Sequence, residues 1–344
     1  AFSVTIPNAS LFFAKIWALI ASVSRLPTIN SEILTDDEKA DIVNFIQDDD
    51  YEIDALLNNR GQLAAFEAHA KYLSGRGWTV EQHLSRKGKD GEFLTDVRPL
   101  DPYGFTYSSG IYGMKWGCIE TLRSKADIED EFNLSISGDN AVVKDFWNSE
   151  KEYIYLKQET GIKGKQIDER DNPYGYPPFI VKAVPFGPGR LKRCGNLQDT
   201  LKGTGESIFY PHRDMFAELN WMASVIKTQA YDDLRPALQM PGDKTAKTPK
   251  EYAGLSKTTK AVKDPLILVP TRGMTRSMLE FMRIIESIIQ RSGLSTIDQG
   301  VLDFPLAAVA LAKMMAVKES LTLPRLQAMS ELYQLRTKMI IDQA

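Results

Sequence analysis

Two amphipathic helical patterns on either side of a short unit constrain the fold of this chain most. Five apolar residues of the first pattern recur at the spacing of one helical face: Met215, Leu219, Met222, Ile226 and Ala230. The second pattern has a stripe of its own: Met278, Phe281, Met282, Ile285, Ile288 and Ile289. Methionine is prominent in both stripes, so packing between the two helices is the simplest interpretation. The chain is therefore expected to leave through one helix and to come back through the other.

The unit between the helices, residues Ala237–Gly273, is predicted to be a small α/β element. Short strands are expected at Ala237–Met240 and Leu266–Val269, with a short helix near Pro249–Leu255. Pro236 ends the preceding helix and so marks where the unit begins. Its middle is locally basic and carries Lys244, Lys247, Lys250, Lys257, Lys260 and Lys263. These lysines can grip an acidic partner or DNA phosphates, and an ordinary solvated surface is an equally weighted alternative.

The composition is that of a globular chain and restricts the classes to consider. With 344 residues, 43% hydrophobic and 25% charged, the chain can bury a sizeable core in one or two domains. The net charge of -3 gives no global basic field, so contact with nucleic acid must be local or weak. Cys118 and Cys194 are too few for a disulfide framework and are expected to be buried thiols in a reducing compartment such as the cytoplasm.

The most apolar run, Leu11–Val23, is expected to form a short buried or docking helix. It contains Lys15 and is shorter than the roughly 20 residues that a bilayer span needs. No basic region precedes it, so a secretory signal is not expected. A second helix is expected to open at Asp36 and Asp37, and a third to cover Gly61–Leu73.

The middle of the chain is predicted to be a mixed α+β module. The expected strands are Phe93–Leu100, Tyr112–Thr121, Ala141–Trp147, Tyr153–Lys157 and Phe179–Phe186. Tyr112, Met114, Trp116 and Cys118 alternate along one strand, which predicts that their face is buried. A short helix is expected between two strands, with Ser124 as its N-cap and Asp127 in the capping-box position.

Motifs of catalysis and metal binding are not readable in the sequence. No G-x-x-x-x-G-K-S/T string exists, so ATP hydrolysis is not expected, and the stretch GTGES at 203–207 is interpreted as a helix-entry turn. His69, His83 and His212 are scattered, and no metal site is expected. The acidic run at 48–54 lacks the glycine of a calcium loop and predicts a solvated face.

Several strings of the sequence resemble those of one family. Glu206–Pro241 reads ESIFYPHRDMFAELNWMASVIKTQAYDDLRPALQMP, Leu266–Gly273 reads LILVPTRG, and Leu306–Ile340 contains the pair Leu323-Pro324. Upstream, Leu100–Phe132 opens with an Asp-Pro turn. In their order, these strings are similar to the stem helix, clip strand, tunnel helix and wing of the portal proteins of tailed bacteriophages. The resemblance covers most of the chain and rests on the order of the elements.

The resemblance implies an α+β fold with a mixed α/β wing, long stem and tunnel helices and a small α/β clip. The implied boundaries are a wing at 1–205, a stem helix at 206–236, a clip at 237–273, a second stem helix at 274–291, a tunnel loop at 292–304 and a tunnel helix at 305–344. In the family a helical crown commonly follows the tunnel helix, whereas this sequence ends at Ala344. A shortened or partial subunit is therefore expected.

The function implied by the resemblance is structural, not enzymatic. About twelve identical subunits are expected to close a ring at a capsid vertex, through which double-stranded DNA passes without sequence-specific contacts during packaging and ejection. Other implied partners are the large terminase subunit, a tail adaptor and the major capsid protein, with no membrane and no cofactor. The implied location is the virion, after assembly in the host cytoplasm.

Individual residues follow from the same resemblance. The candidates for facing DNA in the channel are Arg276, Arg283, Arg291, Ser292, Ser295, Thr296, Asp298 and Gln299. The arginines can instead pair with Glu280 and Glu286 on the helix surface. Contacts of the clip with the packaging motor and the adaptor are assigned to its six lysines together with Glu251 and Tyr252.

Two other functions compete with this one. Another head or tail structural protein, such as an adaptor, also lacks catalytic residues but should lack a clip-like insertion between two amphipathic helices. A nucleic-acid-processing enzyme needs clustered carboxylates or a phosphate loop, and carboxylates distant in sequence can converge only in the fold.

Overall fold

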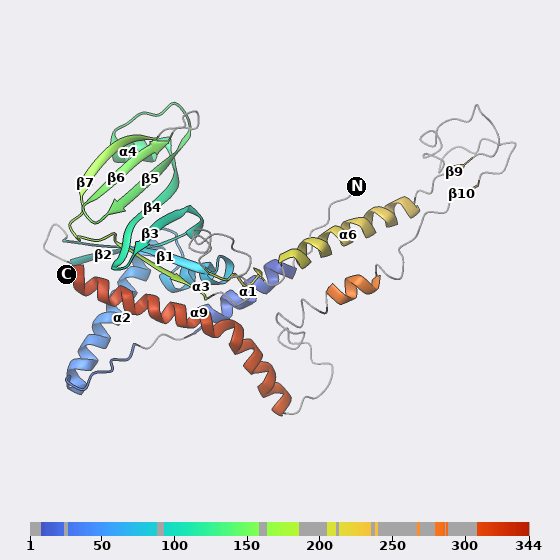
Figure 1. Cartoon of the computed structure of the whole chain (residues 1–344), viewed down its shortest axis with the longest axis horizontal. Coiled ribbons are helices and arrows are strands. Elements are labelled where there is room, and N and C mark those ends of the chain that lie inside the picture. The colour runs from blue at the N-terminus through green and yellow to red at the C-terminus, as the bar shows by residue number, and fades with distance from the viewer. Residues whose placement is uncertain are drawn as a thin grey trace. The chain divides into compact units, whose positions relative to one another are not determined.

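The structure is a computed structural model that describes residues 8–23, 27–87, 93–157, 164–185, 205–210, 213–234, 238–239, 267–268, 279–285, 287 and 308–343 (Figure 1). The chain divides into two compact units. The larger unit comprises 13–208 and 308–344, and the smaller unit comprises 1–12 and 209–307. Among the described helices, none is both long and apolar enough to cross a membrane.

Two antiparallel sheets form the centre of the larger unit. The first has the order β2-β1-β8, built from β1 (Trp78–Lys87), β2 (Phe93–Leu100) and β8 (Phe179–Ala183). The second runs in sequence order from β3 to β7: β3 (Phe105–Gly110), β4 (Gly113–Ser124), β5 (Asn140–Asn148), β6 (Lys151–Lys157) and β7 (Lys165–Asp171). The predicted α+β class is therefore confirmed at this coarse level, and both sheets are antiparallel.

The two sheets share a core of large apolar side chains. Buried residues of both sheets pack together there: Val80, Leu84, Phe105, Ile119, Trp147 and Phe179. A second cluster lies under the short helix α4 (Lys125–Phe132) at the other end of the five-stranded sheet, where Ile128 packs against Val143 and Ile154. Burial of each such side chain contributes about 1.5–3 kcal/mol to the stability of the unit.

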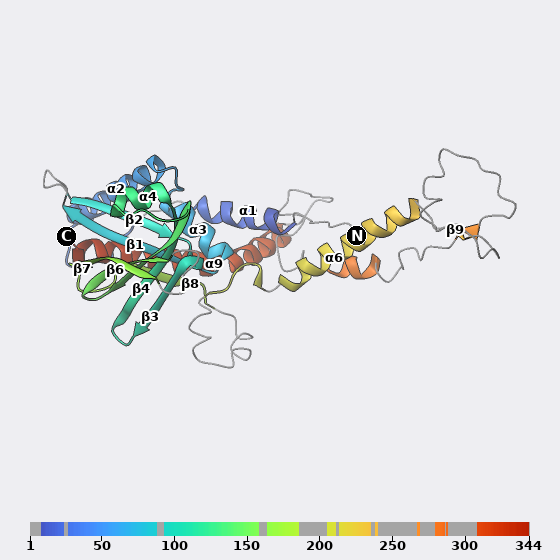
Figure 2. The ribbon, with the colours of Figure 1, turned by 90° about the horizontal axis from the view of Figure 1, so that it is seen from above.

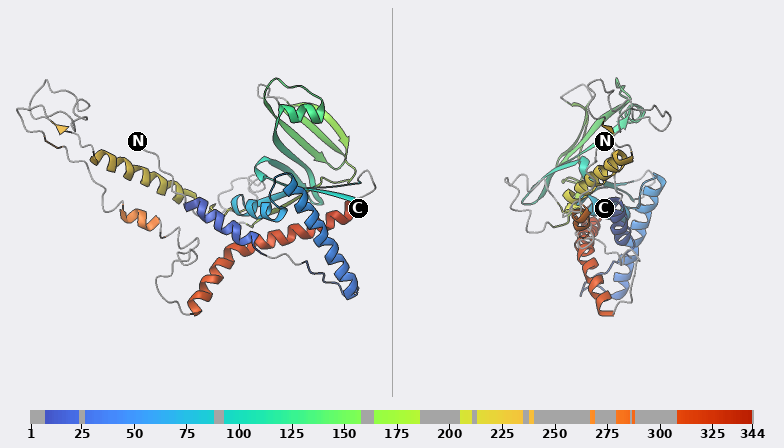
Figure 3. Two further views of the ribbon diagram at one scale, coloured as in Figure 1. Left: turned by 180° about the vertical axis from the view of Figure 1, so that it is seen from behind. Right: turned by 90° about the vertical axis from the view of Figure 1, so that its right-hand side faces the viewer.

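Helices cover the other face of the three-stranded sheet. They are α2 (Asp36–Asn59), α3 (Ala65–Gly75) and α9 (Ala308–Gln343) (Figure 3), and the C-terminal part of α1 (Asn8–Ala21) lies against α3. In α1, the expected buried helix, Ile16 and Ile20 are fully inaccessible. α9 continues through Pro324 and bends once along its length (Figure 1), as expected for a helix with an internal proline.

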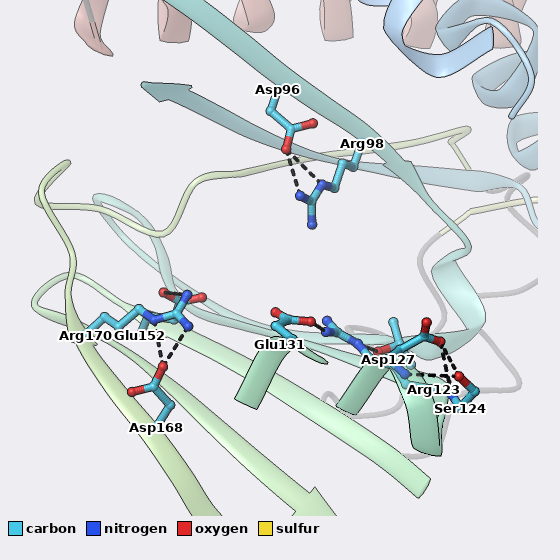
Figure 4. Close-up of polar contacts among 10 residues, drawn as sticks. Asp96, Arg98, Arg123, Ser124, Asp127, Glu131, Glu152, Asp168 and Arg170 are labelled. Carbon is cyan, nitrogen blue, oxygen red and sulfur yellow. Dashed lines mark hydrogen bonds and ion pairs between the residues drawn. The ribbon is translucent and has the colours of Figure 1, made fainter. Parts of the chain in front are cut away.

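Helix starts in the larger unit follow the local sequence. Ser124 caps α4 by accepting a hydrogen bond from the backbone N–H of Asp127, whose carboxylate bonds back to Ser124 (Figure 4). The predicted capping box is thus confirmed. Thr35 and Glu38 form a second capping box at the start of α2, one residue before the expected acidic opening.

One prediction for the larger unit is wrong, and three strands are missing from the prediction. On β4 the buried face carries Gly117 and Ile119, whereas Tyr112 is exposed and Trp116 stacks on Phe146 across the other face. Tyr112 lies in the turn, and a register shift opposite Ser108 and Ser109 breaks the alternation, so Met114 packs on the inner core while Trp116 does not. The strands β1, β3 and β7 are absent from the sequence-based expectation.

The acidic run and the GTGES stretch also differ from expectation. Within 48–54, Asp50 forms an ion pair with Arg336 and Asp54 accepts a hydrogen bond from the backbone of Ala65, so the run is not simply solvated. Gly205, at φ +124°, lies against the backbone of Gly77, where a Cβ atom would meet the carbonyl oxygen at 1.9 Å. The described end of GTGES therefore packs against the chain after α3, and no helix begins there.

Candidate self-association and channel surfaces

The smaller unit contains the helix pair expected from the two amphipathic patterns. α6 (Arg213–Leu234) is followed by β9 (Leu238–Gln239), β10 (Ile267–Leu268) and a helical segment at 279–285. Leu219 and Met222 of α6 pack against Ile285, and Met215 and Met282 cover the edge of this contact. The methionine-rich stripes therefore form a helix–helix contact, as the sequence predicts.

The two short strands of the smaller unit, β9 and β10, pair with each other. These two strands are antiparallel, with Ile267 opposite Gln239 and Leu268 opposite Leu238. They coincide with the two short strands expected at either end of the lysine-rich unit. The chain thus leaves through α6, passes a two-stranded connection and returns along the segment that packs on α6.

A second set of apolar side chains on the helix pair is not buried. Trp221 on α6 is 61% exposed, and Phe281 and Ile284 on the returning segment are 50% and 54% exposed. Phe281 and Ile284 are neighbours one helical turn apart. Leu279 and Tyr231 add further exposed apolar surface. Neighbouring exposed apolar groups such as Phe281 and Ile284 mark interaction sites, so the exposed surface of the returning segment has the character of an interface.

Of the residues predicted to face DNA, the structure describes one. Arg283 lies between Phe281 and Ile284 on the returning segment, and its side chain is exposed. Outside the described residues lie Arg276, Arg291, Ser292, Ser295, Thr296, Asp298 and Gln299, as do the clip candidates Lys244, Lys247, Lys250, Glu251, Tyr252, Lys257, Lys260 and Lys263.

A buried ion cluster in the larger unit was not predicted from the sequence. Arg336 of α9 donates from Nε to Glu81 Oε1 at 2.9 Å and from Nη2 to Glu81 Oε2 at 2.5 Å, and Nη1 donates to Asp50 at 2.8 Å. Its guanidinium also lies 4.2 Å from the ring centroid of Tyr333. The cluster therefore ties α9 to β1 and α2.

His69 of α3 completes the cluster. Its Nε2 lies 2.6 Å from Glu81 Oε2 and its Nδ1 lies 2.7 Å from Thr79 Oγ1. Burial lowers the pKa of His69, so the ring is neutral near pH 7. Because a carboxylate only accepts, Nε2–H donates to Glu81 and Nδ1 accepts from the Thr79 hydroxyl.

The charge state of Glu81 is set by two opposing effects. Burial by itself raises the pKa of this carboxyl, but the positive charge of Arg336 and hydrogen bonds from His69 and Arg336 hold the pKa well below its usual value. Glu81 is therefore ionised and fully buried. The signal in the sequence was the position of Arg336 within the apolar stripe that includes Met329, Leu332 and Ile340.

The described part of the chain has few candidates for a metal site or a catalytic nucleophile. No group of three or more histidine, cysteine, aspartate or glutamate side chains among the described residues is placed to hold a metal ion. Cys118 is half-buried, and burial raises the pKa of its thiol to about 11, which makes it a poor nucleophile at neutral pH.

Paired charges also line the inner faces of the two sheets. Arg98 pairs with Asp96 on β2, Arg123 with Glu131, and Arg170 with Asp168 (Figure 4). Asp96 also pairs with Arg60, and Arg170 also lies within 3.8 Å of Glu152, so these charges form small networks.

Comparison with known proteins adds no assignment. No protein-family model matches the sequence, and no curated protein is similar to it.

Proposed function

We propose that this chain is the portal subunit of a tailed bacteriophage, a structural protein that assembles with copies of itself into a ring-shaped channel for DNA. The observation that carries the proposal is the helix pair of the smaller unit. It buries one apolar stripe between its two helices and leaves a second set, Trp221, Phe281 and Ile284, exposed. Such surface is protected when neighbouring copies pack side by side around an axis.

The order of the elements supports the same proposal. An outgoing helix, a two-stranded connection, a returning helix and then the long helix α9 follow one another along the chain. This matches the stem, clip, stem and tunnel-helix order that the sequence strings suggest. An adaptor is the alternative from the same class, and the β9–β10 insertion between packed helices favours the portal over it.

The channel chemistry follows from the need for DNA to slide. Every strong contact between the channel and a DNA phosphate adds binding affinity, and that contact must be broken each time the DNA advances. A near-neutral chain with isolated exposed arginines such as Arg283 suits this need. In the proposed function, the residues from Arg276 to Gln299 named above face the DNA. The clip lysines, with Glu251 and Tyr252, contact the packaging motor and then the tail adaptor.

Particle images of the purified full chain test the proposal. Rings with a central hole are the expected result. A double variant, Phe281→Ser with Ile284→Ser, should reduce the ring population, while Leu122→Ser, which removes a more exposed apolar side chain from β4, should not. A compact monomer without a pore contradicts the proposal, and metal-dependent nuclease activity of that monomer would support the enzyme alternative.

A further inference from the structure

The hairpin β3–β4 ends in two large apolar side chains that the rest of the larger unit leaves uncovered. Ile111 is 96% exposed and Tyr112 is fully exposed. Two-residue hairpin loops normally carry Asn or Gly, because the favoured turns need positive φ. Ile111 and Tyr112 do not have positive φ, since Asn133 is the one described non-glycine residue that does. The positive φ at this turn is instead that of the flanking Gly113, at +124°. The fold therefore does not require bulky groups at this tip.

An apolar groove in the same unit offers a complementary surface. It lies between α2, α9 and the segment after α1, and its volume is about 650 Å³. Its lining includes Pro27, Ile29, Ile42, Ile46, Met329 and Tyr333. Clefts of ~300–1,000 Å³ accept drug-sized molecules, so the groove has room for the two side chains of the hairpin tip.

The hairpin tip and helix α2 of the groove lie on different sides of the larger unit. In Figure 2 the β3–β4 hairpin projects from one side of the larger unit, α2 lies on the other side, and α9 lies between them. The tip of one copy therefore cannot fill its own groove. Two different patches on opposite sides of one subunit are the arrangement of a head-to-tail interface, which closes into a ring when the rotation between copies permits.

The hairpin carries one positive charge, and the groove lies beside an acidic helix. Between Phe105 and Gly117 the hairpin has a single charged residue, Lys115, and its side chain is exposed. Asp50 is the one charged side chain of the groove lining, and it is already paired with Arg336. Exposed acids of α2 outside the lining include Asp37, Asp41 and Asp48. Lys115 thus approaches an acidic helix when the tip enters the groove, and such complementarity favours this partner over others.

We propose that Ile111 and Tyr112 of one copy insert into the groove between α2 and α9 of the next copy. The partner of the groove is thus a second copy of this chain. This inference rests on the proposed function, because it supplies a contact between neighbouring larger units of the ring. It is separate from the helix pair of the smaller unit, so each contact can be tested alone.

Cysteine crosslinking in the full chain tests the contact directly. The test variant combines Tyr112→Cys with Ser330→Cys, since Ser330 lines the groove and is exposed. Cys194→Ser is present in every variant, and Cys118 is retained because its raised pKa leaves it largely unreactive at pH 7. With a short bis-maleimide, the expected result is a ladder of covalent multimers on a denaturing gel. Each single-cysteine variant should remain at the monomer position.

A matched control places the cysteine at the base of the same hairpin. Tyr103 is also largely exposed, at 85%, but it precedes β3, whose length alone is about 20 Å at ~3.4 Å per strand residue. Tyr103→Cys with Ser330→Cys should give less than a tenth of the multimer. In a second measurement, Ile111→Ser with Tyr112→Ser should raise the concentration for half-assembly at least tenfold, while Tyr103→Ser leaves it unchanged.

The outcomes separate this inference from the proposed function. If the chain forms rings, but the tip and groove cysteines give no ladder and the tip variant assembles normally, the inference is wrong and the portal function stands. If the unmodified chain stays monomeric at all concentrations, both are wrong. A ladder together with weakened assembly of the tip variant supports the contact.

Discussion

Replacement of Arg336 by methionine tests the buried ion cluster that holds α9 against the larger unit. Methionine keeps an unbranched apolar stem and removes the guanidinium from a site that is 2% exposed. Glu81 then remains buried and keeps the hydrogen bond from the neutral His69, but it no longer has a positive charge beside it. Removal of one partner from a buried ion pair costs about 3–5 kcal/mol, because the other charge is left uncompensated.

A double-mutant cycle separates the charge effect from lost packing. Glu81→Gln combined with Arg336→Met removes both charges, so most of the stability lost in Arg336→Met should return. Arg336→Lys keeps the charge but cannot reproduce the two parallel hydrogen bonds to Glu81. The free energy of unfolding of Arg336→Lys should therefore lie between those of the wild type and Arg336→Met. The coupling energy between the two positions should lie in the upper half of the usual range of ~0.5–3 kcal/mol.

Urea unfolding followed by tryptophan fluorescence measures the effect. With m near 2–3 kcal/mol/M, a cost of ~3–5 kcal/mol lowers the midpoint by about 1–2.5 M. In the wild type the pKa of Glu81 is lowered, so its contribution is present above the unfolded pKa near ~4.3 and is lost as pH falls through the folded pKa. Without Arg336, burial raises the pKa of Glu81, and the penalty should shrink between pH 8 and pH 5. A midpoint change below ~0.3 M, or an equal penalty at both pH values, refutes the argument.

Three further predictions concern other parts of the chain. Ser124→Ala removes the side-chain cap of α4 and should cost ~1 kcal/mol, measured by urea unfolding; Ser124→Asp should retain most of the stability. Burial raises the pKa of Asp145, although the positive charges of Arg123 and Arg98 oppose the shift. Because the folded pKa is the higher one, ionisation of Asp145 destabilises the fold as pH rises above the unfolded pKa. Asp145→Asn should therefore raise Tm at pH 8 with little change at pH 4, and a lower Tm at pH 8 contradicts this. Phe281→Ser with Ile284→Ser should reduce assembly without changing the circular dichroism of the chain, because both side chains are exposed.

Part of the fold could be predicted from the sequence because local rules decide it. The stripes with Leu219 and Met222 mark a helix face whatever its partner, and the structure buries both against Ile285. The box formed by Ser124 and Asp127 depends only on residues three apart, and it forms as expected.

The strands that sequence analysis missed carry polar residues for tertiary reasons. β1 places Glu81 and His83 inward, because α9 supplies Arg336 and Gln343 as their partners. β7 is a mostly exposed edge strand, held by backbone pairing to β6. Neither strand shows clean apolar alternation, so the pattern that predicts strands does not detect them.

The candidate interfaces depend on placement that periodicity does not reveal. Trp221 and Ile284 are exposed because the two helices contact each other through Leu219, Met222 and Ile285 instead. Tyr112 was expected on a buried face, yet the hairpin turn brings it to the tip. The groove between α2 and α9 unites segments about three hundred residues apart, which sequence spacing alone does not indicate.

Native mass measurement of the purified full chain shows whether copies of the chain surround a channel. One closed species of about twelve subunits is expected, with few intermediate sizes, because a ring completes all of its contacts only on closure. A monomer at every concentration, or an open series of growing oligomers, would contradict this expectation.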